Sequence, residues 1–477
     1  MKRKIFIITI MIFALFLGAG TTTWGAKGGI PGKPPEDPDE PPPPPTPIEG
    51  YYFWKLGHMD GPHDSSKALG ISRDGKTAVG STVVVDFTRA WRLDIDWAIA
   101  TDDGVPPLYN ELQVQEDIGI VAPSQPSAAY ASSDMNCASY TYDKADKENL
   151  DLDWCGSMPV GGFSIGMVSY GIEWLLPVLD SVDEGDYVSI PDFGGGISDM
   201  NVKDVSLDGT ILVGTGNIKT GLRAFRADTA VVDEDLVPIP VQLVIQDAVT
   251  LQTLRSSAAE AVSADGTIIA GYGSTKIANR AFITTVLDAT TDPITLESTI
   301  LPMLGGGKFA EAYAMTPDGA VIAGRCDSPK GPQACIWFKD DTDVWVVREL
   351  GSLSKKNKDS MATGIAYRPG SAVGELIVVG RSKSILYPSE AFVWTGNPVL
   401  LADGEEPAGY FYDLEYILTK TGAGEASLMG SSWILYEATG ISAAGDRIVG
   451  WGINPEGGIE AWLVTNFPYD ELDLTHE

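Results

Sequence analysis

One sequence pattern recurs six times between residues 68 and 450 and constrains the fold more than any other feature. Each copy begins at alanine or valine, passes through a turn that usually contains Asp-Gly, and closes on a glycine. The closing glycines are Gly80, Gly214, Gly271, Gly324, Gly380 and Gly450. A second signal, Ala followed by an aromatic residue or cysteine, begins 10 residues after that glycine in four copies and 11 residues after it in two. This regular spacing indicates one structural unit repeated along the chain.

Each unit is predicted to be a meander of four β-strands. An apolar residue such as Val205 or Val262 ends the first strand, and Asp-Gly supplies the positive φ angles of a two-residue hairpin turn. The apolar run that follows, such as residues 211–213, is typical of a strand buried on both faces. The Ala-aromatic segment forms the third strand, and residues 345–351 show a fourth. Four strands in a period of roughly 50 to 60 residues predict an all-β chain folded as a β-propeller, because a solenoid coil needs fewer residues.

A degraded seventh copy between the first two brings the prediction to seven four-stranded blades. Gly161 precedes the segment Gly171-Ile172-Glu173-Trp174 by 10 residues, and residues 128–132 would form the first strand. Residues 135–157 are then an insertion rich in Asp and Tyr. Such an insertion is either a binding surface on one rim or a neutral surface loop.

The two ends of the repeat region predict how the ring closes. Residues 51–57 resemble the fourth strand at 345–351, and in both cases 11 residues separate the glycine from the next repeat alanine, Ala68 or Ala362. The chain therefore begins with a fourth strand and ends with a third, at residues 461–465. We expect the N-terminal strand to complete the last blade, which removes an open sheet edge.

The segments outside the repeats predict export. Residues 1–26 read as a signal peptide, with Lys2, Arg3 and Lys4 before the apolar residues 5–17 and a small-residue exit after them. The 13 apolar residues would rise about 20 Å as a helix, short of the roughly 30 Å hydrocarbon core. Residues 27–49 are a Pro-rich linker, either an extended spacer or a ligand for a proline-recognition module. The propeller would span residues 50–468, before an acidic tail at 469–477.

The charge balance limits the partners. The chain has 33 Lys plus Arg against 65 Asp plus Glu, a formal charge of -32, which would repel a nucleic acid backbone. We expect a secreted, extracellular or periplasmic monomer with no membrane insertion after signal cleavage, whose partner is an unknown extracellular protein or glycan.

These segments resemble the extracellular HAF-repeat family, whose copies carry G-[IV]-[NS]-x-x-G-x-[IV]-V-G followed by [HRE]-A-[FW]. The match is strongest where EATGISAAGDRIVGWG leads into EAWLVT, and it covers roughly residues 51–467. The histidine of the family name is replaced in every copy, as by Arg223 and Glu460. The resemblance implies a secreted repeat protein and no particular reaction.

The four cysteines are predicted to form two disulfides. Cys137 and Cys155 bracket the insertion, whereas Cys326 and Cys335 would face each other across a hairpin. An even count in an exported chain, without C-x-x-C spacing, favours disulfides over metal ligation. Four cysteines allow three pairings, so the connectivity stays open.

No catalytic or cofactor-binding motif is evident. The aspartates of the S-x-D-G turns look like those of sialidase Asp-box turns and are expected to bond their own turn amides. Calcium is the one metal with candidate ligands, at Asp94 and Asp96, at Asp151 and Asp153, and at residues 340–343, although an acidic surface explains them equally well. His58 and His63 fit a polar loop.

The tryptophans divide into two groups. Five fall on predicted strands and are expected to pack between blades: Trp54, Trp174, Trp337, Trp394 and Trp462. Trp97, Trp154 and Trp433 lie off the repeat frame and are the candidate ligand-binding aromatics.

Three functions remain open at this point. The first is a non-catalytic propeller that binds a protein or glycan through one rim. The second is a glycan-active hydrolase or lyase with a site assembled from several blades, for which paired carboxylates in the central funnel would be the sign. The third is a structural component of an envelope or matrix.

Overall fold

The computed structural model describes most of the chain after residue 50. The described residues are 51–57, 65–84, 87–95, 110–111, 116–117, 127–132, 159–165, 168–174, 187–191, 193, 200–218, 221–232, 238–276, 278–289, 294–356, 358–370, 374–397, 409–420 and 432–467. The chain divides into two units, Met1–Pro47 and Ile48–Glu477, and all described residues belong to the second.

Within this described part the strands form seven sheets. One sheet contains β2 (Ser65–Ile71), β3 (Thr77–Val84), β4 (Phe87–Asp94) and β6 (Glu116–Asp117). The next contains β7 (Ser127–Ser132), β8 (Pro159–Ile165), β9 (Val168–Trp174) and β10 (Tyr187–Ile190). Then come β11 (Met200–Val205), β12 (Ile211–Ile218), β13 (Gly221–Val232) and β14 (Pro238–Gln242).

The remaining sheets follow in chain order. One contains β15 (Ser256–Val262), β16 (Ile268–Ser274), β17 (Asn279–Asp288) and β18 (Thr295–Ile300). Another contains β19 (Ala310–Met315), β20 (Ile322–Cys326), β21 (Gln333–Lys339) and β22 (Trp345–Gly351). The next has β23 (Ser360–Tyr367), β24 (Leu376–Ser382), β25 (Glu390–Gly396) and β26 (Gly409–Asp413), followed by helix α2 (Leu414–Lys420). The last joins β27 (Ile434–Ile441), β28 (Ile448–Ile453) and β29 (Ile459–Thr465) to β1 (Tyr52–Lys55) and β5 (Asn110–Glu111).

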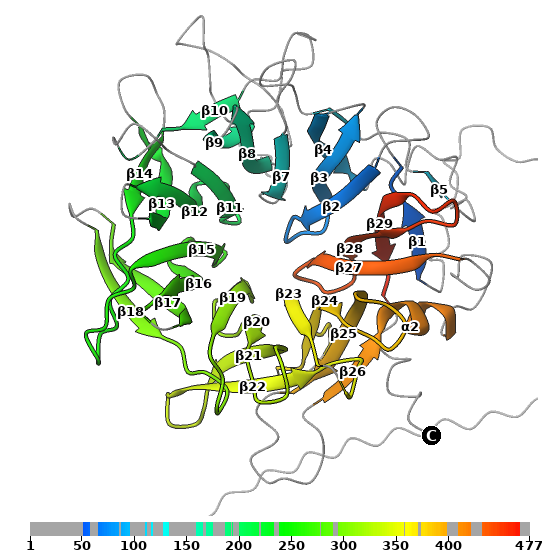
Figure 1. The fold of residues 1–477 in the computed structure, drawn as a ribbon. Helices are drawn as coiled ribbons and strands as arrows, with labels where there is room; N and C mark the ends of the chain where they lie inside the picture. Colours follow the sequence, from blue (N-terminus) through cyan, green and yellow to red (C-terminus); the bar gives the residue numbers. More distant parts are fainter. Residues whose placement is uncertain are drawn as a thin grey trace, which may run out of the picture. The chain divides into compact units, whose positions relative to one another are not determined.

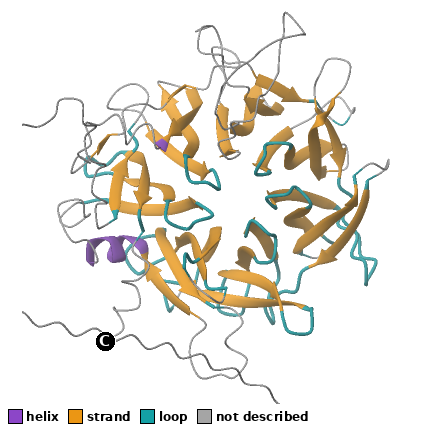
Figure 2. Cartoon of the chain, turned by 180° about the vertical axis from the view of Figure 1, so that it is seen from behind, coloured by secondary structure: helices purple, strands orange, loops and turns teal. Residues whose placement is uncertain are grey.

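The sheets stand in a ring around a common centre. Figure 1 shows the first strand of each meander nearest the centre and the later strands farther out, and Figure 2 shows the same ring from behind. Neighbouring strands of each meander are antiparallel, such as β15 with β16 and β16 with β17. The predicted all-β propeller class is therefore confirmed.

The N-terminal strand closes the ring, as the sequence predicted. β1 pairs antiparallel with β29, from Tyr52 opposite Thr465 to Lys55 opposite Trp462. The Trp54 indole donates to Thr465 Oγ1 at 3.1 Å, which fastens the two ends of the repeat region. Pairing with β1 gives the β29 edge a partner that an open ring would lack.

The repeated residues form one row across each sheet. In the last sheet Ala438 of β27 lies opposite Gly450 of β28, which lies opposite Trp462 of β29. A Cβ atom on Gly450 would come within 2.1 Å of the Glu437 carbonyl oxygen and 2.4 Å of the Trp462 ring. The glycine is therefore required because only a hydrogen fits between the inner strand and the aromatic ring.

The Asp-Gly turns are longer than predicted. Ser72 N donates to Thr77 O and Gly75 N donates to Ser72 O, so four residues, 73–76, form the loop between the hydrogen-bonded Ser72 and Thr77. Among the turn residues only Gly75, at φ 74°, has a positive φ. The prediction of a two-residue hairpin turn was wrong. A longer loop leaves room for the aspartate carboxylate to accept hydrogen bonds from residues of its own turn.

The aspartates of these turns bond their own turns, as predicted. Asp74 Oδ1 accepts from Ser72 Oγ at 2.6 Å and from Lys76 N at 3.0 Å. Asp208, Asp265 and Asp318 do the same in their copies. These carboxylates are structural caps.

The core lies between neighbouring sheets and contains the expected tryptophans. Trp54, Trp337, Trp394 and Trp462 are all buried, which confirms their packing role. The side chain of Trp174 lies outside the described residues. One cluster packs Ala323 and Ile336 against Leu376 and Trp394 of the next sheet, so each sheet is stabilised by the neighbour it faces.

The degraded seventh copy has its predicted strands. Residues 128–132 fall within β7, and Gly161 and residues 171–174 fall in β8 and β9. Its insertion at 135–157 lies outside the described residues. No helix in the described ranges has the length and apolar character needed to cross a bilayer.

The packing of Gly450 generates the first prediction. Gly450→Ala should lower the free energy of unfolding by about 3 kcal/mol, because the added methyl group must displace backbone or the Trp462 ring. Urea unfolding monitored by tryptophan fluorescence measures this difference. Gly305→Ala is the matched control, since no atom lies within 4 Å of the added carbon there. Equal losses in both variants would contradict the packing account.

Candidate functional site

Every innermost strand carries a β-bulge at the same position of the repeat. In β2 the register shifts between Ala68 and Gly70, and in β15 it shifts between Ala259 and Ala261. The residue within each shift has no cross-strand partner: Leu69, Tyr130, Lys203, Glu260, Tyr313, Thr363 and Thr439. A bulge re-aims the side chain it carries.

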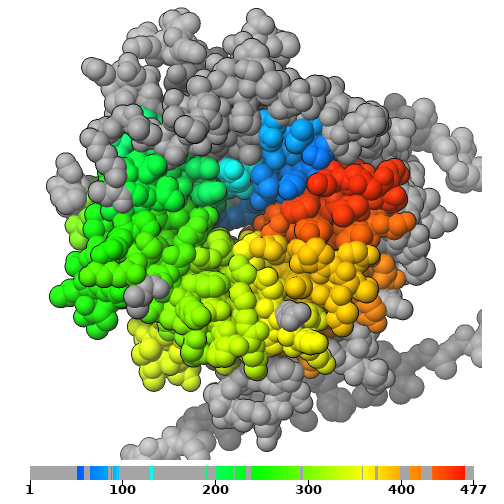
Figure 3. Space-filling model, in the orientation of Figure 1, coloured from blue at the N-terminus to red at the C-terminus, as the bar shows by residue number. Residues whose placement is uncertain are grey.

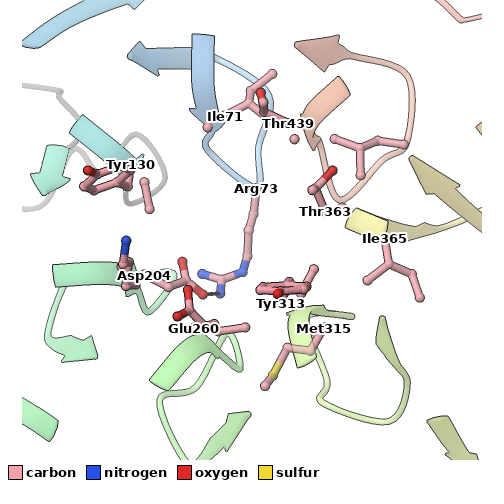
Figure 4. A pocket seen from close by; sticks show the side chains of 18 of the residues that line it. Ile71, Arg73, Tyr130, Asp204, Glu260, Tyr313, Met315, Thr363, Ile365 and Thr439 are labelled. Carbon is pink, nitrogen blue, oxygen red and sulfur yellow. Dashed lines mark ion pairs between the residues drawn. The ribbon is translucent and has the colours of Figure 1, made fainter. Parts of the chain in front are cut away.

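All seven bulged residues line one cavity at the centre of the ring. Its volume is about 270 Å³. Figure 3 shows the molecular surface hollowed at the point where the sheets converge, and Figure 4 shows five of these residues among the labelled side chains of the wall. A cavity built from all seven sheets is the candidate binding site, since ligand sites are concave and lined by a few convergent polar groups.

The wall of the cavity has two chemically different halves. Tyr130, Lys203, Glu260 and Tyr313 form the polar half, on β7, β11, β15 and β19. On the other half, Thr363 Oγ1 donates to Ala438 O at 2.5 Å and Thr439 Oγ1 donates to Ala68 O at 2.9 Å. These threonines join neighbouring sheets, so their hydroxyl hydrogens are already used.

Arg73 reaches into the cavity from the turn after β2. Its Nη1 donates to Val205 O at 2.8 Å and its Nη2 donates to Val262 O at 2.6 Å. The same Nη2 lies 3.6 Å from Asp204 Oδ2. Arg73 therefore ties three sheets together near the centre, as Figure 4 shows.

Asp204 is held in place by backbone amides as well as by Arg73. It accepts from Val205 N at 2.9 Å and from Val262 N at 2.8 Å. Burial raises its pKa, although Arg73 and the two amides act in the opposite direction. Both Asp204 and Arg73 thus have their partners within the protein.

Glu260 differs from Asp204 because its carboxylate is unpaired. Among the described residues it makes no hydrogen bond or ion pair. Burial raises its pKa to about 7, opposed by the positive charge of Lys203 and assisted by the negative charge of Glu311. The group is therefore poised between its two protonation states near neutral pH.

A tyrosine network borders Glu260. Tyr313 Oη donates to Glu311 Oε2 at 2.7 Å, and Asn279 Nδ2 donates to Glu311 Oε1 at 2.8 Å. The Tyr272 and Tyr313 rings meet edge to face with centroids 5.9 Å apart. Burial raises the pKa values of both tyrosines, that of Tyr272 to about 12, so both stay neutral.

The ionisation of Glu260 generates a prediction about stability. The carboxyl pKa is 4.5 when free and about 7 in the folded protein, so between these pH values the folded state binds more protons. The contribution of Glu260 to wild-type stability therefore falls as pH rises from 4.5 to 7, whereas a glutamine cannot ionise. Glu260→Gln should gain up to about 3 kcal/mol over the wild type above pH 7 and nothing below pH about 4.

Urea unfolding of both proteins across this pH range measures the difference. The figure is an upper limit because Glu260 is only partly buried and solvent screens part of the effect. A variant that is less stable at pH about 8, or a difference independent of pH, would contradict the assigned ionisation.

The structure places two of the predicted cysteines together. Cys326 and Cys335 are buried on β20 and β21, with Sγ atoms 2.7 Å apart, and they stand as free thiols. Their adjacency across the hairpin fits the pairing that the sequence favours, and the covalent bond itself stays a prediction. Cys137 and Cys155 lie outside the described residues.

Peptide mapping of the protein without reductant, after expression with residues 1–26 in place, tests this bond. We expect a cross-linked peptide pair containing Cys326 and Cys335, because the two Sγ atoms are 2.7 Å apart and the sequence predicts export to an oxidising compartment. Alkylation of both cysteines in the denatured, unreduced protein would show instead that they remain thiols.

The aromatic candidates have different outcomes. Trp97 and Trp154 lie outside the described residues. Trp433 is 1% exposed and packs edge to face on Phe53 with centroids 5.3 Å apart. Trp433 is therefore not available to bind a ligand at the surface. It is part of the hydrophobic core next to the paired strands β1 and β29.

The calcium candidates gain no support within the described ranges. Asp340 Oδ1 accepts from Thr342 N at 2.9 Å and Val344 N at 3.1 Å, and Asp343 pairs with Lys339 at 2.9 Å. No group of three or more metal-ligating side chains is found among the residues that can be described. Asp96, Asp151 and Asp153 lie outside these ranges, as does the side chain of Asp94.

Comparison of the chain with protein-family models and with curated proteins finds no match. Solved structures with similar folds include an oligogalacturonate lyase in complex with manganese, with 10% identity over 85% of this chain and 91% of that one and a TM-score of 0.45. A puromycin hydrolase has 14% identity over 85% of this chain and 54% of that one, with a TM-score of 0.44. A putative TolB from Agrobacterium tumefaciens has 13% identity over 65% and 86%, with a TM-score of 0.33.

Proposed function

We propose that this chain is a secreted, non-catalytic β-propeller, one blade per sheet, that binds an extracellular or cell-surface ligand in its central cavity. The ligand is a protein or a glycan. The proposal of export and of kinship with the HAF-repeat proteins rests on residues 1–26 and on the repeat segments.

One observation carries the proposal. The residue before each bulge is Ala or Val and the residue after it is usually Gly or Ala, whereas the bulged residue changes from Leu69 to Lys203 to Glu260. The neighbouring positions keep small or apolar residues because they pack within the sheets. The bulged position varies at the one place where all sheets meet, as expected of a wall shaped for recognition.

A glycan-active enzyme is the second candidate, and Glu260 is the observation that favours it. A carboxyl group with a pKa of about 7 in a central cavity suits general acid–base chemistry. Asp204 and Glu311 are further carboxylates near it. Asp204 and Glu311 are, however, already hydrogen-bonded within the protein, which favours binding over catalysis.

A glycan array probed with the chain from residue 27, with and without chelator, tests the proposal. We expect saturable binding to one glycan class that Tyr130→Ala weakens, because this ring lines the cavity. Tyr387→Ala is the control, since that side chain lies on the exposed outside with 37% of its surface accessible. Equal losses in both variants would place binding elsewhere.

The same array separates the three functions. Mass spectrometry of the bound glycan after incubation would show shortened products only if the chain is an enzyme. Absence of binding to glycans and to cell-surface proteins, together with ordered self-assembly, would contradict the binding function and favour a structural component.

A further inference from the structure

Two oppositely charged side chains face the cavity side by side without using their hydrogen-bonding capacity. Lys203 and Glu260 occupy the same repeat position on β11 and β15, whose sheets are adjacent. Within the described part of the chain, neither side chain makes a hydrogen bond or an ion pair. Lys203 Nζ lies 4.3 Å above the Tyr130 ring, and its positive charge lowers the pKa of Glu260 without an ion pair between the two.

The other charged groups of the wall are not available in this way. Arg73 is committed to two carbonyl oxygens and to Asp204, and Asp204 also accepts two backbone amides. Glu311 does not line the cavity, and its carboxylate accepts hydrogen bonds from Asn279 and Tyr313. The donors of Lys203 and the acceptors of Glu260 are therefore the groups left for a ligand.

The hydrogen-bonding groups of Lys203 and Glu260 determine which ligand groups can bind to both. Lys203 offers donors and no acceptor, whereas ionised Glu260 offers acceptors and no donor. Adjacent hydroxyl groups of a polyol satisfy both, because one hydroxyl donates to the carboxylate while the next accepts from the ammonium group. Since the two protein charges compensate each other, the ligand need bring no charge of its own.

The rest of the polar half suits a sugar ring. Tyr130 and Tyr313 stand on either side of the Lys203 and Glu260 positions in the order of the sheets, as Figure 4 shows for Tyr130, Glu260 and Tyr313. An aromatic face is the negative part of the ring quadrupole and attracts the C–H face of a sugar. The cavity volume of about 270 Å³ lies at the small end for ligand pockets, so it holds one ring.

We propose that the central cavity binds a single neutral, polyhydroxylated ring, a hexose unit at the end of a glycan, with Lys203 and Glu260 as its hydrogen-bonding pair. This inference rests on the proposed binding function and names the ligand class for the same cavity. It predicts recognition of a chain end, since the cavity has room for one ring.

Saturation-transfer NMR and calorimetry at pH about 8 with glucose, galactose and mannose test this inference, with galacturonate and glycine as charged probes. We expect one neutral hexose to bind, with its affinity reduced about tenfold or more by Lys203→Met and by Glu260→Gln, since each removes hydrogen bonds to a charged group. Lys308→Met is the matched control, because Lys308 is exposed and does not line the cavity, and it should retain binding. Circular dichroism confirms the fold of each variant.

Two results would overturn the inference while leaving the broader function intact. Hexose binding that survives both variants would place the sugar elsewhere, and preferential binding of galacturonate or glycine would show that the pair selects charge. If no monosaccharide binds but a polymer on the glycan array does, the ligand class is wrong and the binding function stands. If neither binds, the sugar inference fails, and the broader binding function fails with it only if cell-surface proteins do not bind either.

Discussion

The structure depends on the close approach of each innermost strand to the second strand at the repeat glycine. At Gly214 an added Cβ would lie 2.0 Å from the Asn201 carbonyl, and at Gly324 it would lie 2.0 Å from the Glu311 carbonyl. The same approach recurs under aromatic rings such as Trp462. This contact fixes the register of the first three strands of each sheet, and the buried rings then pack against the next sheet. A glycine with a fixed partner on each side therefore explains why the spacing of the repeat is so regular.

The bulge is the second consequence of that approach. Because the strand shifts register beside the glycine, one residue of each inner strand is released from the ladder and is aimed at the centre. The fold thus accommodates side chains as different as those of Leu69, Lys203 and Tyr313 at that position. On each innermost strand the repeat Ala or Val packs within the sheet, and the next residue, at the bulge, faces the cavity. Asp204 combines the two roles. It follows the bulged residue, where the other copies have Gly or Ala, and its carboxylate is stabilised there by two backbone amides and by Arg73.

The sequence predicted the architecture better than the site. The propeller class, the packing of Trp337 and Trp394, and the pairing of β1 with β29 followed from spacing and polarity, which reflect local strand geometry and burial. The turn length was wrong because Asp-Gly also occurs in four-residue loops capped by the aspartate. Trp433 lies off the repeat frame, yet the seam between the chain ends buries it against Phe53. The cavity residues were missed because they lie about one repeat apart. The sequence feature that could have identified them is the variable position directly after the repeat alanine or valine.

A crystal structure of the chain soaked with the hexose that binds in solution tests the central claim most directly. The account predicts electron density for one sugar ring in the central cavity, with hydroxyl groups within hydrogen-bonding distance of Lys203 Nζ and the Glu260 carboxylate. The arrangement of Arg73 and Asp204 should be unchanged, since their partners lie within the protein. Density for the sugar on an outer rim, with the central cavity filled only by water, would contradict the claim that the bulged residues form the binding site.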